Sequence, residues 1–138
     1  MFELDPRLAQ NGPEIESLFP DHLVIIMENR DYPWLVVVPQ KANIAEVHEL
    51  DEAARNRLFE VIARLSQALK QLTGADKINL DLIGNMVPQL HAHISARKKS
   101  DPLWPLPIWR EPPTPGNWVS TYPDFVEQLR KQLSANGQ

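Results

Sequence analysis

The sequence predicts an α+β fold, with an antiparallel sheet of about five strands, one long helix on one face and a C-terminal helix. Short β-branched apolar runs bounded by turn residues predict the strands, and two segments with apolar residues at helical spacing predict the helices. A chain of 138 residues is the size of one domain with a modest core.

Four segments are predicted to be strands. Residues 22–27 and 34–38 are rich in β-branched side chains and are joined by a short polar connection. Residues 78–83 form a third strand, which ends before Gly84. Residues 89–97 form a fourth, in which two sets of side chains alternate: apolar Leu90, Ala92, Ile94 and Ala96, and polar Gln89, His91, His93, Ser95 and Arg97. One face of this strand is therefore polar.

Two helices are predicted, separated by a proline-rich arm. The first covers residues 51–72, and Gly74 follows it as a stop signal; the second covers residues 123–133, with a proline in its first turn. Between them, residues 101–115 contain six of the thirteen prolines, which excludes regular helix or sheet. We therefore expect a domain of residues 1–100, and a segment of residues 101–138 packed on that domain or on a dimer partner.

Composition excludes several classes of protein. The net charge of -4 argues against binding of a nucleic acid polymer, which requires a basic stripe. There is no cysteine, hence no disulfide, thiol nucleophile or Cys-type zinc site. The first ten residues carry three charges and do not form a secretory signal, and the apolar runs are too short to span a membrane. We expect a cytoplasmic protein without a membrane partner.

His91 and His93 are neighbours on the polar face of the last predicted strand. Such neighbours lie roughly 6–7 Å apart, so both imidazoles can reach one phosphate group. Three interpretations are open: a solvated strand face, two ligands of a metal site, or an imidazole nucleophile whose neighbour donates to phosphoryl oxygens. The metal site lacks an obvious third ligand, because His22 and His48 are distant in sequence. Spacing alone does not favour the nucleophile.

The segment Gly-Asn-Met-Val-Pro-Gln-Leu-His-Ala-His-Ile-Ser-Ala-Arg (residues 84–97) resembles the signature of the histidine triad (HIT) family. That signature is His-x-His-x-His followed by apolar residues, with a Gly-Gln-Ser/Thr-Val-type turn ahead of it. His91 matches the middle histidine and His93 the last. Residues 26–30 and 34–39 also resemble the sugar-contacting strand of the family and the strand after it. The resemblance covers residues 20–99 and implies a HIT-like fold.

The resemblance implies roles for individual residues. The middle histidine of the family attacks the α-phosphorus, and water hydrolyses the nucleotidyl-histidine, so His91 is the expected nucleophile. His93 is expected to donate to a non-bridging oxygen. Asn29 is the candidate ribose contact, and Asn79 and Asn85 are candidates for the phosphate or leaving group. For each asparagine the alternative is a turn or edge-strand residue that satisfies its own backbone.

Two positions depart from the family pattern. Gln89 stands in place of the first histidine, and Met86 stands where a Ser or Thr often assists the leaving group. Glutamine can hold His93 or a phosphate oxygen through hydrogen bonds, but it does not titrate near neutral pH. We therefore expect either retained chemistry with altered rate or leaving-group preference, or nucleotide binding with little turnover. Arg97 is expected to be a surface or interface charge.

The function implied is hydrolysis or transfer at the α-phosphate of a nucleotide conjugate, such as a dinucleoside polyphosphate, a nucleoside phosphoramidate or an adenylylated small molecule. No built-in metal or cofactor is implied, although Mg²⁺ can arrive with a polyphosphate. The family also implies a homodimer whose sheets meet edge to edge. The alternatives are a nucleotide sensor with weak catalysis and a structural dimerisation module that binds no nucleotide.

Overall fold

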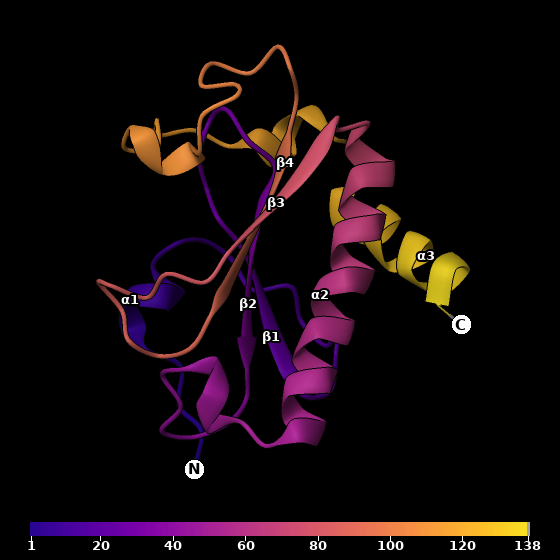
Figure 1. Cartoon of the computed structure of the whole chain (residues 1–138). Coiled ribbons are helices and arrows are strands. Elements are labelled where there is room, and N and C mark those ends of the chain that lie inside the picture. Colours follow the sequence, from indigo (N-terminus) through magenta and orange to yellow (C-terminus); the bar gives the residue numbers. More distant parts are fainter. Residues whose placement is uncertain (138) are drawn as a thin grey trace.

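The computed structural model describes residues 1–137. Its sheet is antiparallel with strand order β1-β2-β4-β3, where β1 is His22–Ile26, β2 is Trp34–Pro39, β3 is Lys77–Asp81 and β4 is Ala92–Arg97. The helices are α1 (Pro6–Ala9), α2 (Glu52–Thr73) and α3 (Phe125–Gly137), and short 3-10 turns lie at Val47–Glu49 (η1), Ile108–Arg110 (η2) and Trp118–Thr121 (η3). The predicted α+β fold, with its long helix and C-terminal helix, is confirmed (Figure 1).

The described part of the chain has four strands in its sheet rather than about five. The segment before β1 runs along that strand but forms only an isolated bridge between Glu14 and Ile25. Pro13 accepts a hydrogen bond from Ile26 there but has no N–H to donate, so the pairing does not extend into a regular strand.

Helix α2 is capped at both ends, and it ends at the predicted Gly74. The Asp51 side chain accepts a hydrogen bond from the Ala54 N–H at 2.8 Å, and Gly74 closes the helix with a φ of 68° in the left-handed region. The apolar stripe is buried against one face of the sheet and against α3, and consists of Leu58, Val61, Ile62, Leu65, Ala68 and Leu69. This face contains the apolar residues predicted for the last strand, including Ala92 and Ile94.

The opposite face of the sheet, on the side of α1 in Figure 1, is covered rather than solvated. Side chains of the N-terminal segment and of the proline-rich arm pack on it and form a second apolar cluster, with Leu8, Ile25, Trp34, Val36 and Ile108 among its members. Consequently every residue of β4 is buried, including those of the polar row. The polar groups of this row must therefore find partners within the protein.

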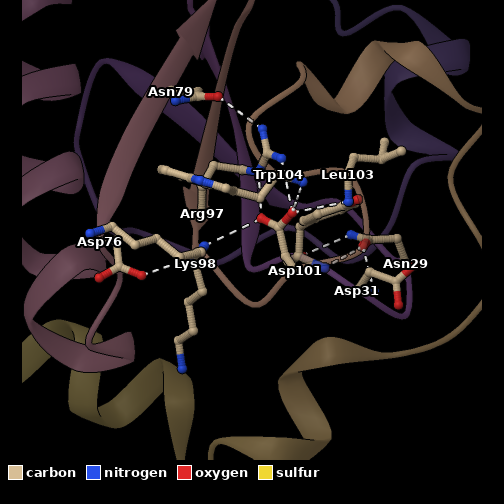
Figure 2. Close-up of polar contacts among 11 residues, drawn as sticks. Asn29, Asp31, Asp76, Asn79, Arg97, Lys98, Asp101, Leu103 and Trp104 are labelled. Carbon is tan, nitrogen blue, oxygen red and sulfur yellow. Dashed lines mark hydrogen bonds and ion pairs between the residues drawn. The ribbon is translucent and has the colours of Figure 1, made fainter.

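Arg97 corrects an expectation, because it is neither a surface nor an interface charge but only 1% exposed. Its Nε and Nη2 donate to the two carboxylate oxygens of Asp101 at 2.7 and 3.0 Å, and its Nη1 donates to Asn79 Oδ1 at 3.1 Å (Figure 2). The guanidinium also lies against the rings of Tyr32 and Trp104. The physical reason is the arm, which turns back at Asp101 and covers the end of β4.

Asp101 anchors the start of the arm. Besides binding Arg97, its carboxylate accepts hydrogen bonds from the backbone N–H groups of Lys98, Leu103 and Trp104 (Figure 2). Burial acts to raise the pKa of Asp101, but the hydrogen bonds and charge of Arg97 outweigh it, so the pKa lies below its ordinary value. The arm is therefore tied to β4 by an ionised, fully hydrogen-bonded group.

The residues that follow the arm pack on the connection between β1 and β2. Trp118 donates its backbone N–H to the carbonyl of Asn29 and its indole N–H to the carbonyl of Met27, at 2.9 and 3.0 Å. Its side chain packs in the apolar core beside α2, together with Phe125 and Leu129.

None of the helices within residues 1–137 combines the length and the apolar character that a bilayer crossing requires.

Candidate active site

His91 and His93 line a pocket of about 520 Å³ on the covered face of the sheet. Three parts of the chain build its walls. The N-terminal segment contributes Arg7, Leu8 and Asn11, the loop between β3 and β4 contributes residues 83–87, and the arm contributes Trp109. Met27, which follows β1, completes the lining.

His91 lies directly before β4 and is oriented by a backbone carbonyl. Its Nδ1 lies 2.7 Å from the carbonyl oxygen of Gln89. Because a carbonyl oxygen can only accept, Nδ1 carries the hydrogen of the neutral ring and Nε2 keeps its lone pair. The ring therefore presents a nitrogen that can act as a nucleophile.

His93 has the complementary tautomer. Its Nδ1 accepts a hydrogen bond of 3.0 Å from the indole N–H of Trp34, which can only donate, so Nε2 carries the hydrogen. The ring centroids of the two histidines are 4.8 Å apart. Burial, and secondarily the charge of His91, lowers the pKa of His93 to about 3. At neutral pH the side chain is a neutral N–H donor beside the nucleophile.

This pKa makes stability depend on pH. The unfolded chain binds a proton on His93 below its ordinary pKa of 6.5, whereas the folded chain does not bind one until about pH 3, so stability falls as the pH falls through this window. When the pH is lowered from 7 to 5, we expect the free energy of unfolding to fall by about 2 kcal/mol because of His93. Urea denaturation of wild type and His93→Asn, whose amide oxygen can still accept from Trp34, measures the difference. An equal pH dependence in the two proteins would contradict it.

Trp109 forms the aromatic wall of the pocket. Its ring centroid is 4.8 Å from that of His93 and 5.3 Å from that of Trp34, and both contacts are edge-on. The side chain remains 41% exposed, so part of its ring is available to a ligand. The arm thus contributes directly to the pocket, which its composition alone did not predict.

Gln89 lies before β4 begins and outside the pocket lining. Strand β4 starts at Ala92 rather than at residue 89, so the predicted alternation does not carry Gln89 to the side of His93. Its Oε1 accepts from the backbone N–H of Asp5 and its Nε2 donates to the carbonyl of Glu3, both at 2.8 Å. The side chain therefore binds the N-terminal segment, makes no hydrogen bond to His93 and does not line the pocket beside it.

The three asparagines lie in three different environments. Asn29 is buried, and its amide bonds to the backbone of the β1–β2 connection, donating to Met27 and Tyr32 and accepting from residues 31 and 32. Asn79 accepts a hydrogen bond from Arg97 and does not line the pocket. Of these three candidates, Asn85 alone lines the pocket with the histidines. The structure thus brings together His91, His93 and Asn85, and not Asn29, Asn79 or Gln89.

Sequence reasoning did not identify Arg7, Leu8 or Trp109 as pocket residues. A weak signal was present, because Asp5 followed by Pro6 is a helix-start pattern, and the Asp5 side chain does accept a hydrogen bond from the Arg7 N–H. This pattern predicts one helical turn but not where the turn packs on the sheet.

Within residues 1–137, no group of three or more His, Cys, Asp or Glu side chains is arranged to hold a metal ion.

Comparison with known proteins gives the family. A model of the HIT domain matches residues 17–100. Histidine triad proteins from Bradyrhizobium japonicum and Sinorhizobium meliloti are both 35% identical, with TM-scores of 0.87 and 0.86; the alignments cover 96% of this chain and 98% and 97% of theirs. One from Marinobacter aquaeolei is 34% identical over 98% of both chains, with a TM-score of 0.86. No curated protein matches. The chain belongs to the histidine triad (HIT) family.

Proposed function

We propose that the protein hydrolyses or transfers a nucleoside monophosphate unit of a nucleotide conjugate, through a nucleotidyl-His91 intermediate. Membership of the HIT family supports nucleotide binding or hydrolase chemistry in general terms. The observation that carries the finer proposal is the pair of complementary tautomers, a free Nε2 on His91 and an N–H on His93, with ring centroids 4.8 Å apart in one pocket.

In this proposal His91 Nε2 attacks the α-phosphorus, and the N–P bond forms as the bond to the leaving group breaks. The His93 N–H donates to a non-bridging oxygen on which negative charge is held in the transition state. Water then attacks the phosphorus, the N–P bond breaks, and the nucleoside monophosphate leaves with His91 restored. Leu8, Met27 and Trp109 offer apolar and aromatic surface for a nucleobase.

The leaving group decides which substrates suit this site. Gln89 cannot supply a proton, and its side chain is engaged with residues 3 and 5. A phosphate leaving group departs as an anion, whereas an amine must be protonated as it leaves. The proposed substrates are therefore dinucleoside polyphosphates rather than phosphoramidates, with Mg²⁺ entering only as a companion of the polyphosphate.

A substrate panel tests this function. We expect wild type to release AMP from diadenosine polyphosphates with a kcat/KM at least about tenfold above that for adenosine phosphoramidate. Chromatography of the released AMP measures both rates. A preference for the phosphoramidate would contradict the proposed leaving-group chemistry. AMP binding without turnover of any substrate would favour the nucleotide sensor, and no binding at all would favour the dimerisation module.

We also propose that the protein is a homodimer joined through the outer edge of β3. This strand is at the end of the sheet, so its outer N–H and C=O groups have no strand partner in the described chain. Leu80, Leu82 and Ile83 are exposed on and beside it, which makes this edge apolar. An edge-to-edge pairing of two copies covers both features.

A further inference from the structure

The fixed positive charge of the pocket around His91 lies on the N-terminal segment that forms one of its walls. Among the described residues that line this pocket, Arg7 alone carries a fixed positive charge. His93 is neutral, and His91 must be neutral to attack. A nucleotide phosphate is anionic, and an anion transferred into a partly apolar pocket is stabilised by a charge-assisted hydrogen bond.

The Arg7 guanidinium is oriented but not saturated. Its Nε and Nη2 donate to the Asp5 carboxylate at 3.1 and 2.8 Å, and its Nη1 donates to the carbonyl of Met86 at 3.0 Å. A guanidinium has five N–H groups, so two remain for a ligand. The side chain is 57% exposed, and its bond to Met86 fixes it against the loop that lines the pocket before His91.

Gln89 fixes the segment that carries Arg7. Gln89 lies two residues before His91 along the chain. Both polar atoms of its side chain bind the backbone of residues 3 and 5. The pKa of Asp5 is lowered mainly by its hydrogen bonds with Arg7, so Asp5 and Arg7 form an ion pair at neutral pH. Gln89, which replaces the first histidine, thus connects the segment before β4 that carries the nucleophile to this pair.

We propose that Arg7 binds a phosphate oxygen of the nucleotide held beside His91, and that Gln89 is the positioning residue that docks Arg7 there. The inference rests on the proposed nucleotide function. The cation reaches the pocket from the N-terminal segment, on the face of the sheet where α1 lies (Figure 1). Gln89 acts only through backbone hydrogen bonds and touches no substrate.

Calorimetric titration with AMP and with adenosine tests the role of Arg7. We expect Arg7→Gln to weaken AMP binding at least about tenfold and to change adenosine binding less than about twofold, since only AMP has the phosphate. Arg30→Gln is the matched control: Arg30 also pairs with a nearby aspartate, Asp31, its side chain is 63% exposed, and it lies outside this pocket. It should bind both ligands as wild type does.

A double variant tests the role of Gln89. We expect Gln89→Leu to weaken AMP more than adenosine, and to have no further effect on the AMP-to-adenosine ratio when Arg7→Gln is already present. Thermal melting confirms that each variant is folded. Equal losses for the two ligands, or unchanged AMP binding by Arg7→Gln, would overturn the inference and leave the nucleotide function standing. Failure of wild type to bind AMP would overturn both.

Discussion

His91→Ala is expected to lower the release of AMP from diadenosine polyphosphates at least about 10³-fold in kcat, because it removes the atom that forms the covalent intermediate. The ring is replaced by a methyl group in a pocket whose other walls are unchanged. AMP should therefore still bind within a few-fold of the wild-type affinity. Steady-state kinetics and calorimetric titration with AMP separate the two effects.

The control for this variant is His48→Ala, because His48 is an exposed histidine outside the pocket. It should retain the full rate. Mass spectrometry of acid-sensitive adducts after rapid mixing should place an adenylyl group on the peptide containing residue 91 in wild type and not in His91→Ala. Turnover by His91→Ala near the wild-type rate would disprove nucleophilic catalysis by this residue.

Asp101→Ala is expected to lower the free energy of unfolding by about 3–5 kcal/mol, because it leaves the Arg97 charge buried without its partner. Asp101 and Arg97 are 6% and 1% exposed, so the guanidinium left by this change is far from bulk water. The same change removes the acceptor of three backbone N–H groups at the start of the arm. Urea denaturation followed by circular dichroism measures the loss.

The chain provides a matched control in the exposed pair Glu127–Lys131, which has the same i,i+4 spacing. Glu127→Ala should cost less than about 0.5 kcal/mol, as surface pairs do. The double variant Arg97→Met, Asp101→Leu should be less destabilised than Asp101→Ala, since it leaves no unpaired charge. If Asp101→Ala and Glu127→Ala lose the same stability, the buried pair does not anchor the arm.

The elements of the fold were largely predictable because their signals are local. The stripe of α2 and the Gly74 that follows it occur within one stretch of sequence, and both specify the helix without help from the rest of the chain. The alternation in β4 likewise predicted which side chains face α2. The segment before β1 adds only an isolated bridge to the sheet, because the effect of Pro13 on pairing appears only when its neighbour strand is known.

The environment of the polar row was not predictable in the same way. Whether Arg97 is exposed depends on residues 101–115, whose prolines specify irregular backbone but not the direction in which it turns. The partners of Gln89 lie more than eighty residues away along the chain, with a separation of 84 to Asp5. The motif identified His91 and His93, but their tautomers follow from contacts with a carbonyl and an indole that no sequence pattern specifies.

Arg7 and Trp109 line the pocket but lie outside the residues that match the family model, which matters when the gene is cut or fused. The HIT-domain match ends at residue 100, next to Asp101, and begins at residue 17, after Arg7. A gene fragment limited to the matched residues carries both histidines but lacks two walls of their pocket and the partner of a buried arginine. The stretch of chain that contains the complete pocket is therefore longer, at both ends, than the stretch that matches the family model.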